Sequence, residues 1–109
     1  MEITEEKFAK LLDESVFENL EIFRDVLHYY YKERIIEDID SGLTEDDYPN
    51  WRITIKGDKY NIYIELKYFM IWTDAPNQPE VSHFHFDYCF FKELFFDLLD
   101  PMVNDTFKY

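Results

Sequence analysis

Residues 51–66 read WRITIKGDKYNIYIEL, and this stretch decides the fold. Apolar and polar residues alternate from Trp51 to Lys56 and again from Tyr60 to Lys67. A period of two is typical of half-buried strands, because successive side chains point to opposite faces of a sheet. Gly57 and Asp58 separate the two runs in the order that a type II′ turn favours. The stretch predicts an antiparallel hairpin whose core face carries Ile53, Ile55, Ile62 and Ile64.

On the C-terminal side, the second strand can continue through Phe69 and Trp72, and residues 73–80 predict a loop because they contain two prolines. Residues 81–88 alternate again and predict a third strand, with Phe84 and Phe86 on the core face. Residues 90–99 predict a last helix that ends at Pro101. Its apolar residues Leu94, Phe95 and Leu98 are expected to cover the sheet.

The N-terminal side predicts two helices. Thr4 is a candidate N-cap for a short helix that ends near Asp13. Ser15 and Glu18 form the pattern of a capping box, and a long helix is expected to follow and to end at Gly42. Apolar residues recur at helical spacing along it, namely Val16, Leu20, Phe23, Leu27, Tyr30, Tyr31, Ile35 and Ile39.

Together these elements predict an α+β fold in the order α-α-β-β-β-α. A three-stranded antiparallel sheet is expected to pack against the long helix and the C-terminal helix. The length favours one domain over residues 1–109, with an acidic helical region (residues 1–42) and a region that holds the sheet and the last helix (residues 51–109).

The composition excludes several functions. The chain has 109 residues, with 24 Asp and Glu against 11 Lys and Arg, a formal charge of −13. This charge argues against direct binding to nucleic acid or to an anionic membrane, since like charges repel. The single cysteine cannot form an internal disulfide, and with no export signal it favours a cytoplasmic location. Neither a phosphate-binding loop nor a reaction motif is present, so no enzyme activity and no cofactor are predicted.

The negative charge is concentrated in the first half of the chain. Residues 1–50 hold 15 acids and 5 bases, whereas residues 51–109 hold 9 acids and 6 bases. The densest cluster comprises Glu37, Asp38, Asp40, Glu45, Asp46 and Asp47. With Glu33, these carboxylates form a candidate surface for a basic partner, although a solvated, solubilising face gives the same pattern.

Aromatic side chains near the acidic cluster are candidate apolar anchors, because Tyr and Trp are enriched at protein interfaces. Tyr29, Tyr30 and Tyr31 are consecutive on the predicted helix, so at least one of them is expected to be exposed. Tyr48 and Trp51 flank the acidic loop. The alternative is that these large rings fill the core.

A second candidate site lies on the third predicted strand. His83, His85 and Asp87 alternate there, so their side chains share one face and form a possible zinc or iron site. Alternation on the solvated side of a half-buried sheet produces the same pattern, and no metal is assigned. Cys89 lies between aromatic residues and is interpreted as a buried residue rather than a nucleophile.

The small size, strong negative charge, abundant aromatic residues and absence of an enzyme motif resemble small phage-type anti-defence inhibitors, such as anti-CRISPR and anti-restriction proteins. The segment from Leu27 to Tyr31, followed by Glu33 to Asp47, is similar to the acidic helices of DNA mimics. The resemblance implies an inhibitor that blocks the nucleic-acid site of a basic protein, such as a CRISPR effector nuclease or a restriction enzyme. Three alternatives stay open: an immunity protein for a toxin nuclease, a small metal-dependent enzyme that uses His83, His85 and Asp87, and a structural or regulatory subunit.

Overall fold

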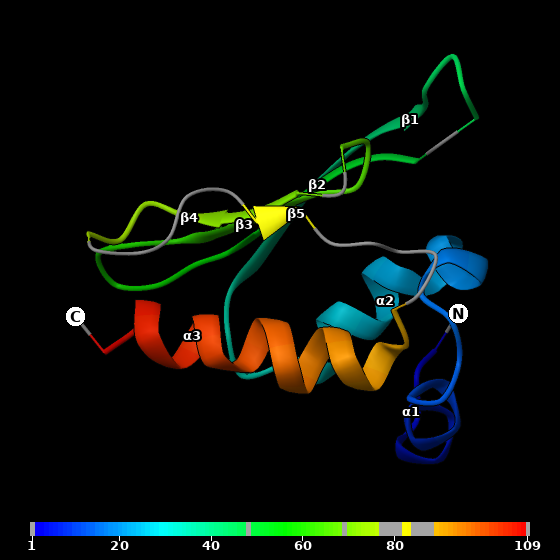
Figure 1. Cartoon of the computed structure of the whole chain (residues 1–109), viewed down its shortest axis with the longest axis horizontal. Coiled ribbons are helices and arrows are strands. Elements are labelled where there is room, and N and C mark those ends of the chain that lie inside the picture. Colours follow the sequence, from blue (N-terminus) through cyan, green and yellow to red (C-terminus); the bar gives the residue numbers. More distant parts are fainter. Residues whose placement is uncertain (1, 48, 69, 77–81, 84–88, 109) are drawn as a thin grey trace.

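The computed structural model describes all residues except 1, 48, 69, 77–81, 84–88 and 109. It is an α+β fold with an antiparallel sheet, which confirms the predicted class. Helices lie on one face of the sheet, with α2 (Leu20–Tyr30) and α3 (Asp100–Thr106) beneath the strands and α1 (Glu5–Leu11) at the side (Figure 1). No helix among the described residues is long and apolar enough to cross a bilayer.

The sheet has the order β1-β2-β3-β4-β5, so each strand pairs with its neighbour in sequence. The strands are β1 (Ile36–Leu43), β2 (Pro49–Ile55), β3 (Ile62–Glu65), β4 (Met70–Thr73) and β5 (Ser82–His83). The prediction of three strands is therefore wrong in number. The expected long strand after residue 60 is two strands, β3 and β4, which pair with each other so that Ile64 lies beside Ile71 and both are buried.

The central hairpin is confirmed, but its turn differs from the prediction. Ile55 pairs with Ile62, so the connection spans residues 56–61 rather than two residues. Gly57 does not adopt the positive φ that a type II′ turn requires at that position. It serves close packing instead, since a Cβ atom there would lie 2.5 Å from Cε1 of Phe107.

The predicted long helix over residues 15–42 is wrong in its second half. Helix α2 ends at Tyr30, and residues 36–43 form the edge strand β1, so the expected helical region over residues 1–42 is corrected as well. Two forces favour the strand. Acidic residues at a helix C-terminus oppose the helix dipole, and the β-branched residues of this segment suit a pleated sheet.

Gly42 has the positive φ expected of it, at 88°, but within a strand rather than at a helix end. The register of β1 against β2 shifts between Asp40 and Leu43, which marks a bulge at this glycine. The sequence pattern thus located a left-handed backbone position correctly and assigned it to the wrong element.

The N-terminal segments show one confirmed cap and one that is wrong. Oγ1 of Thr4 accepts a hydrogen bond from the backbone N–H of Lys7 at 3.2 Å and caps α1. Ser15 does not cap a helix. It bridges to Phe90, and η1 (Phe17–Asn19) precedes α2. Pairing with the C-terminal segment therefore replaces the capping box.

The last helix is longer than predicted and passes through Pro101. A π-helix, η3 (Glu93–Leu99), leads directly into α3. The N–H of Asp100 bonds to the carbonyl of Phe95, and Pro101 then lies in the first turn of α3. Because proline has no N–H, the helix continues through Pro101 with one backbone hydrogen bond fewer.

The core lies between the sheet and the helical layer. The four predicted isoleucines of the hairpin are fully buried, as are Leu94 and Phe95, and Leu98 is half-buried. Phe84 and Phe86 lie outside the described residues. On the opposite face of the sheet, Arg52 lies over the rings of Tyr63 and Trp72, which stack on each other with centroids 5.3 Å apart.

Candidate functional site: the acidic arm

Residues 33–47, which we call the acidic arm, form the edge of the sheet and the turn that follows it. The far end of the β1–β2 hairpin projects from the body of the molecule (Figure 1). All seven predicted carboxylates of the arm belong to exposed residues: Glu33, Glu37, Asp38, Asp40, Glu45, Asp46 and Asp47. Glu45, Asp46 and Asp47 lie on the projecting turn, and Glu37, Asp38 and Asp40 lie along β1. Glu33 lies at the opposite end of the strand, beside Asp100 and Val103 of α3. The predicted surface is therefore a strand and a turn and not a helix end.

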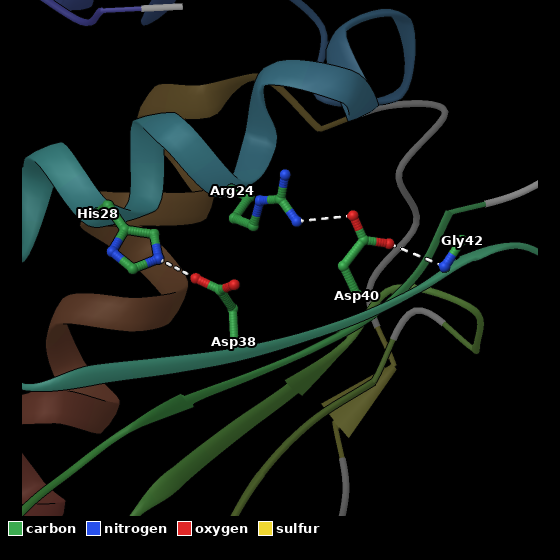
Figure 2. Close-up of polar contacts among 5 residues, drawn as sticks. All are labelled: Arg24, His28, Asp38, Asp40 and Gly42. Atoms are coloured by element: carbon green, nitrogen blue, oxygen red, sulfur yellow. Dashed lines mark hydrogen bonds and ion pairs between the residues drawn. The ribbon is translucent and has the colours of Figure 1, made fainter.

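Two side chains of α2 fix the base of the arm. Nη1 of Arg24 lies 2.9 Å from Oδ2 of Asp40, and Nε2 of His28 contacts Oδ2 of Asp38. Figure 2 shows both side chains reaching from α2 to β1. The other oxygen of Asp40 accepts the backbone N–H of Gly42 at 2.8 Å. The bulge and the helix thus hold Asp40 at both oxygens.

These contacts also fix the charge of the arm. The N–H of Gly42 and the guanidinium of Arg24 hold the pKa of Asp40 below its ordinary value, because both stabilise the carboxylate form. The guanidinium additionally lies 4.8 Å from the ring centroid of Trp51. The arm is therefore anchored by α2 at Asp38 and Asp40, while its turn carries further acids toward solvent.

The arm also carries exposed apolar side chains. Ile35 and Ile39, which the sequence pattern assigned to the apolar face of a helix, are 71 % and 61 % exposed, and Leu43, just after the predicted helix, is 67 % exposed. Isolated exposed apolar residues are common, but these three follow one another along the edge of the sheet beside the acids. Had the segment been interpreted as a strand, its alternation would have placed Ile39 opposite the buried face.

Leu43 and Asp47 face the beginning of α2 across a hollow of about 380 Å³. Phe17, Leu20 and Ile22 contribute apolar surface to this hollow, and Glu18 and Glu21 add two more carboxylates. Asp47 has a φ of 62° and closes the turn by donating its N–H to the carbonyl of Thr44 at 3.0 Å. Apolar and acidic surfaces from distant stretches of the sequence therefore meet at the end of the arm.

The predicted aromatic anchors lie mostly in the core. Trp51 and Tyr31 are buried, with 8 % and 7 % exposure. Tyr30 and Tyr31 donate hydrogen bonds to the two oxygens of Asp100, at 2.6 and 2.7 Å. Tyr29 and Tyr30 are half-buried. The expectation that at least one of the three tyrosines is exposed is therefore wrong. Tyr48 lies outside the described residues.

The second candidate site is only partly described. His83 pairs with Met70 in β5, whereas His85 and Asp87 lie outside the described residues, so the metal hypothesis stays a prediction. No cluster of three metal-ligating side chains occurs among the residues that could be searched. Burial, with a contribution from Glu93, raises the pKa of the half-buried Cys89 to about 11. A thiol with this pKa is a poor nucleophile at neutral pH.

The acidic arm thus combines charge, exposure and a neighbouring hollow. Comparison with known proteins found no matching family model, no matching curated protein and no matching solved structure.

Proposed function

We propose that this protein is a non-enzymatic inhibitor that binds a basic, nucleic-acid-handling protein and occupies its nucleic-acid site. The observation that carries the proposal is the row of exposed acidic residues along β1 and the projecting turn after it, which ends in Glu45, Asp46 and Asp47. Such a surface attracts a positively charged cleft and accelerates encounter. A CRISPR effector nuclease or a restriction enzyme has the required chemistry, and the proposed setting is the cytoplasm.

Mimicry of a nucleic acid is the mode of binding that we propose for this surface. Successive residues of a strand rise by about 3.3 Å and alternate between its faces, so carboxylates on one face recur about 6.6 Å apart. Glu37 and Asp38 point to opposite faces of the strand, so the edge presents negative charge on both sides. Ile39 and Leu43 add apolar area that a nucleic acid lacks, and this area would favour a protein partner over free cations.

The test compares two triple variants with equal changes in charge. The first neutralises the end of the arm (Glu45→Gln, Asp46→Asn, Asp47→Asn), and the second neutralises exposed acids elsewhere (Glu2→Gln, Glu5→Gln, Asp58→Asn). Each immobilised protein captures partners from a lysate, and short duplex DNA is then added as a competitor. We expect a basic partner that is retained by the wild type and the second variant, lost by the first, and released by DNA or salt.

Capture that is insensitive to neutralisation of the arm would overturn the proposal, and so would a partner that DNA does not displace. A cognate toxin nuclease as the captured partner would favour the immunity-protein alternative, which uses the same surface. A metal-dependent enzyme is tested separately by metal analysis of the purified protein and of the His83→Ala variant. A bound transition metal that the variant loses would support that alternative.

A further inference from the structure

We infer that the outer edge of β1 binds an extended, basic segment of the partner by strand addition, so that the sheet gains one more strand. Strand addition joins two chains through backbone hydrogen bonds at an exposed sheet edge. The inference rests on the proposed function only for the basic character of the partner. Strand addition goes beyond the proposed function, because mimicry of a nucleic acid by side-chain charges needs no backbone pairing.

The hydrogen bonds of the sheet show which backbone groups face outward. The N–H of Lys56 bonds to the carbonyl of Ile35 at 2.9 Å, which identifies residues 35 and 56 as a hydrogen-bonded pair. In an antiparallel ladder such pairs alternate with non-hydrogen-bonded pairs, whose backbone N–H and C=O groups point away from the partner strand. Ile36, Asp38 and Asp40 therefore direct their backbone N–H and C=O groups away from β2.

The neighbouring ladder gives the same result independently. The N–H of Leu66 bonds to the carbonyl of Trp51 at 3.1 Å, so the odd-numbered residues of β2 face β3. Thr54 and Arg52 must then face β1, where they pair with Glu37 and Ile39. The even-numbered residues of β1 are left on the free side, and no strand among the described residues pairs there.

The edge has the shape and rigidity that an added strand requires. Residues 36–40 keep a regular register with β2 before the bulge, and the contacts of Arg24 and His28 hold this stretch of the strand against α2 (Figure 2). Ile39 and Ile35, which are largely exposed, offer apolar contact to side chains of an incoming strand. The bulge at Gly42 ends the regular stretch, so we place the added strand along residues 36–40.

Charge selects the occupant. Asp38 and Asp40 are paired with His28 and Arg24, so Glu37 is the acid of this stretch that meets an incoming strand without either cation. A second copy of this chain would bring further acids against Glu37, and like charges that face each other destabilise a strand pair. Inward-pointing charges at an edge are a common protection against such self-pairing. A segment in which Lys or Arg alternates with β-branched residues meets opposite charge on the same edge, so it pairs where a second copy is repelled.

Amide hydrogen exchange of the isotopically labelled protein tests the inference, with a short capped peptide of alternating lysine and valine as the probe. With peptide at ten times its dissociation constant, we expect exchange of the outward amides of Ile36, Asp38 and Asp40 to slow by about tenfold. The amides of Glu37 and Ile39, already bonded to β2, are expected to change little. The matched peptide of alternating glutamate and valine is expected to protect none of them.

Two variants separate backbone pairing from charge. Asp38→Ala keeps the outward N–H and removes the carboxylate, whereas Asp38→Pro removes both. Proline is tolerated at an edge position whose N–H faces solvent. We expect Asp38→Ala to retain the alternating protection and Asp38→Pro to lose it. Because the exchange measurement on the wild type stands by itself, the test does not depend on folding of the proline variant.

The inference is overturned if the lysine peptide binds without alternating protection, or if the chain pairs with itself through this edge in sedimentation experiments. Loss of partner capture on neutralising the arm, without alternating protection, would contradict strand addition and leave the proposed function intact. If the lysine peptide protects alternate amides but neutralising the arm does not change partner capture, the proposed function is contradicted and strand addition is retained.

Discussion

Nη1 of Arg24 on α2 lies 2.9 Å from Oδ2 of Asp40 on β1, and this ion pair joins the acidic arm to the helical layer. The same guanidinium covers the ring of Trp51. One side chain therefore connects the helix, the edge strand and the second strand. Together with the contact of His28 with Asp38 and the pairing of β1 with β2, Arg24 fixes the position of the carboxylates on β1.

The first prediction concerns this contact. We expect Arg24→Ala to lower the free energy of unfolding more than Asp40→Asn does, because only the first change removes the cation–π contact with Trp51. That contact contributes about 0.5–1 kcal/mol at an exposed site. Urea unfolding followed by circular dichroism measures both changes, with Lys10→Ala in the exposed Glu6–Lys10 pair as the control. Equal losses for the Arg24 and Asp40 variants would contradict this role.

The second prediction concerns Asp100, which accepts hydrogen bonds from Tyr30 and Tyr31 and so joins α2 to the C-terminal helix. We expect Asp100→Ala to reduce stability by about 3 kcal/mol, since hydrogen bonds to charged groups contribute roughly 1.5–3 kcal/mol each and Tyr31 is buried. The exposed Asp97 in the preceding helical turn is the matched control. Its change to alanine should shift stability by no more than about 0.5 kcal/mol.

The third prediction is a loss of stability in alkali. Burial, together with Asp100, raises the pKa of both Tyr30 and Tyr31 above the ordinary value of 10.0. The folded state then keeps protons that the unfolded state releases, so the stabilisation is complete below pH 10 and falls as the pH rises above it. Urea midpoints measured between pH 8 and pH 11 should show this fall. Tyr31→Phe should flatten it, and an unchanged pH dependence would contradict the assignment.

The fourth prediction compares the two glycines. Gly42 has a φ of 88° with open space around it, so Gly42→Ala should cost about 1 kcal/mol from backbone strain alone. Gly57→Ala should cost more, because the new methyl group would collide with the ring of Phe107 and with the carbonyl of Tyr60. Melting temperatures measure both. The order of the two variants is the critical result, and the reverse order would show that Phe107 does not pack there.

The fifth prediction concerns Cys89, whose pKa of about 11 lies above the ordinary value of 9.0. At pH 8 its thiolate fraction is lower by about a hundredfold than that of an ordinary thiol, so alkylation by iodoacetamide should be slow. The rate should rise with pH up to about 11. The same chain in urea is the control, and rapid alkylation of the folded protein would contradict burial of the thiol.

The sequence alone determined the central hairpin, the buried isoleucines, the Thr4 cap and the α+β class. These features depend on neighbours within a few residues, where side-chain alternation and capping hydrogen bonds dominate the free energy. The left-handed position of Gly42 was also predictable, because it follows from the conformational freedom of one residue.

Only the tertiary structure decided that residues 36–43 form an edge strand. Their apolar spacing fits a helix as well as a strand, and pairing with β2 decides between the two by satisfying the backbone groups of one side. Because the segment is a strand, Ile39 lies at the surface rather than on the apolar face of a helix. The acids lie along a sheet edge rather than at a helix end. The candidate anchors Trp51 and Tyr31 are instead part of the core between the sheet and the helices. Local sequence fixes which residues are charged or apolar, whereas long-range pairing fixes which of them a partner can reach.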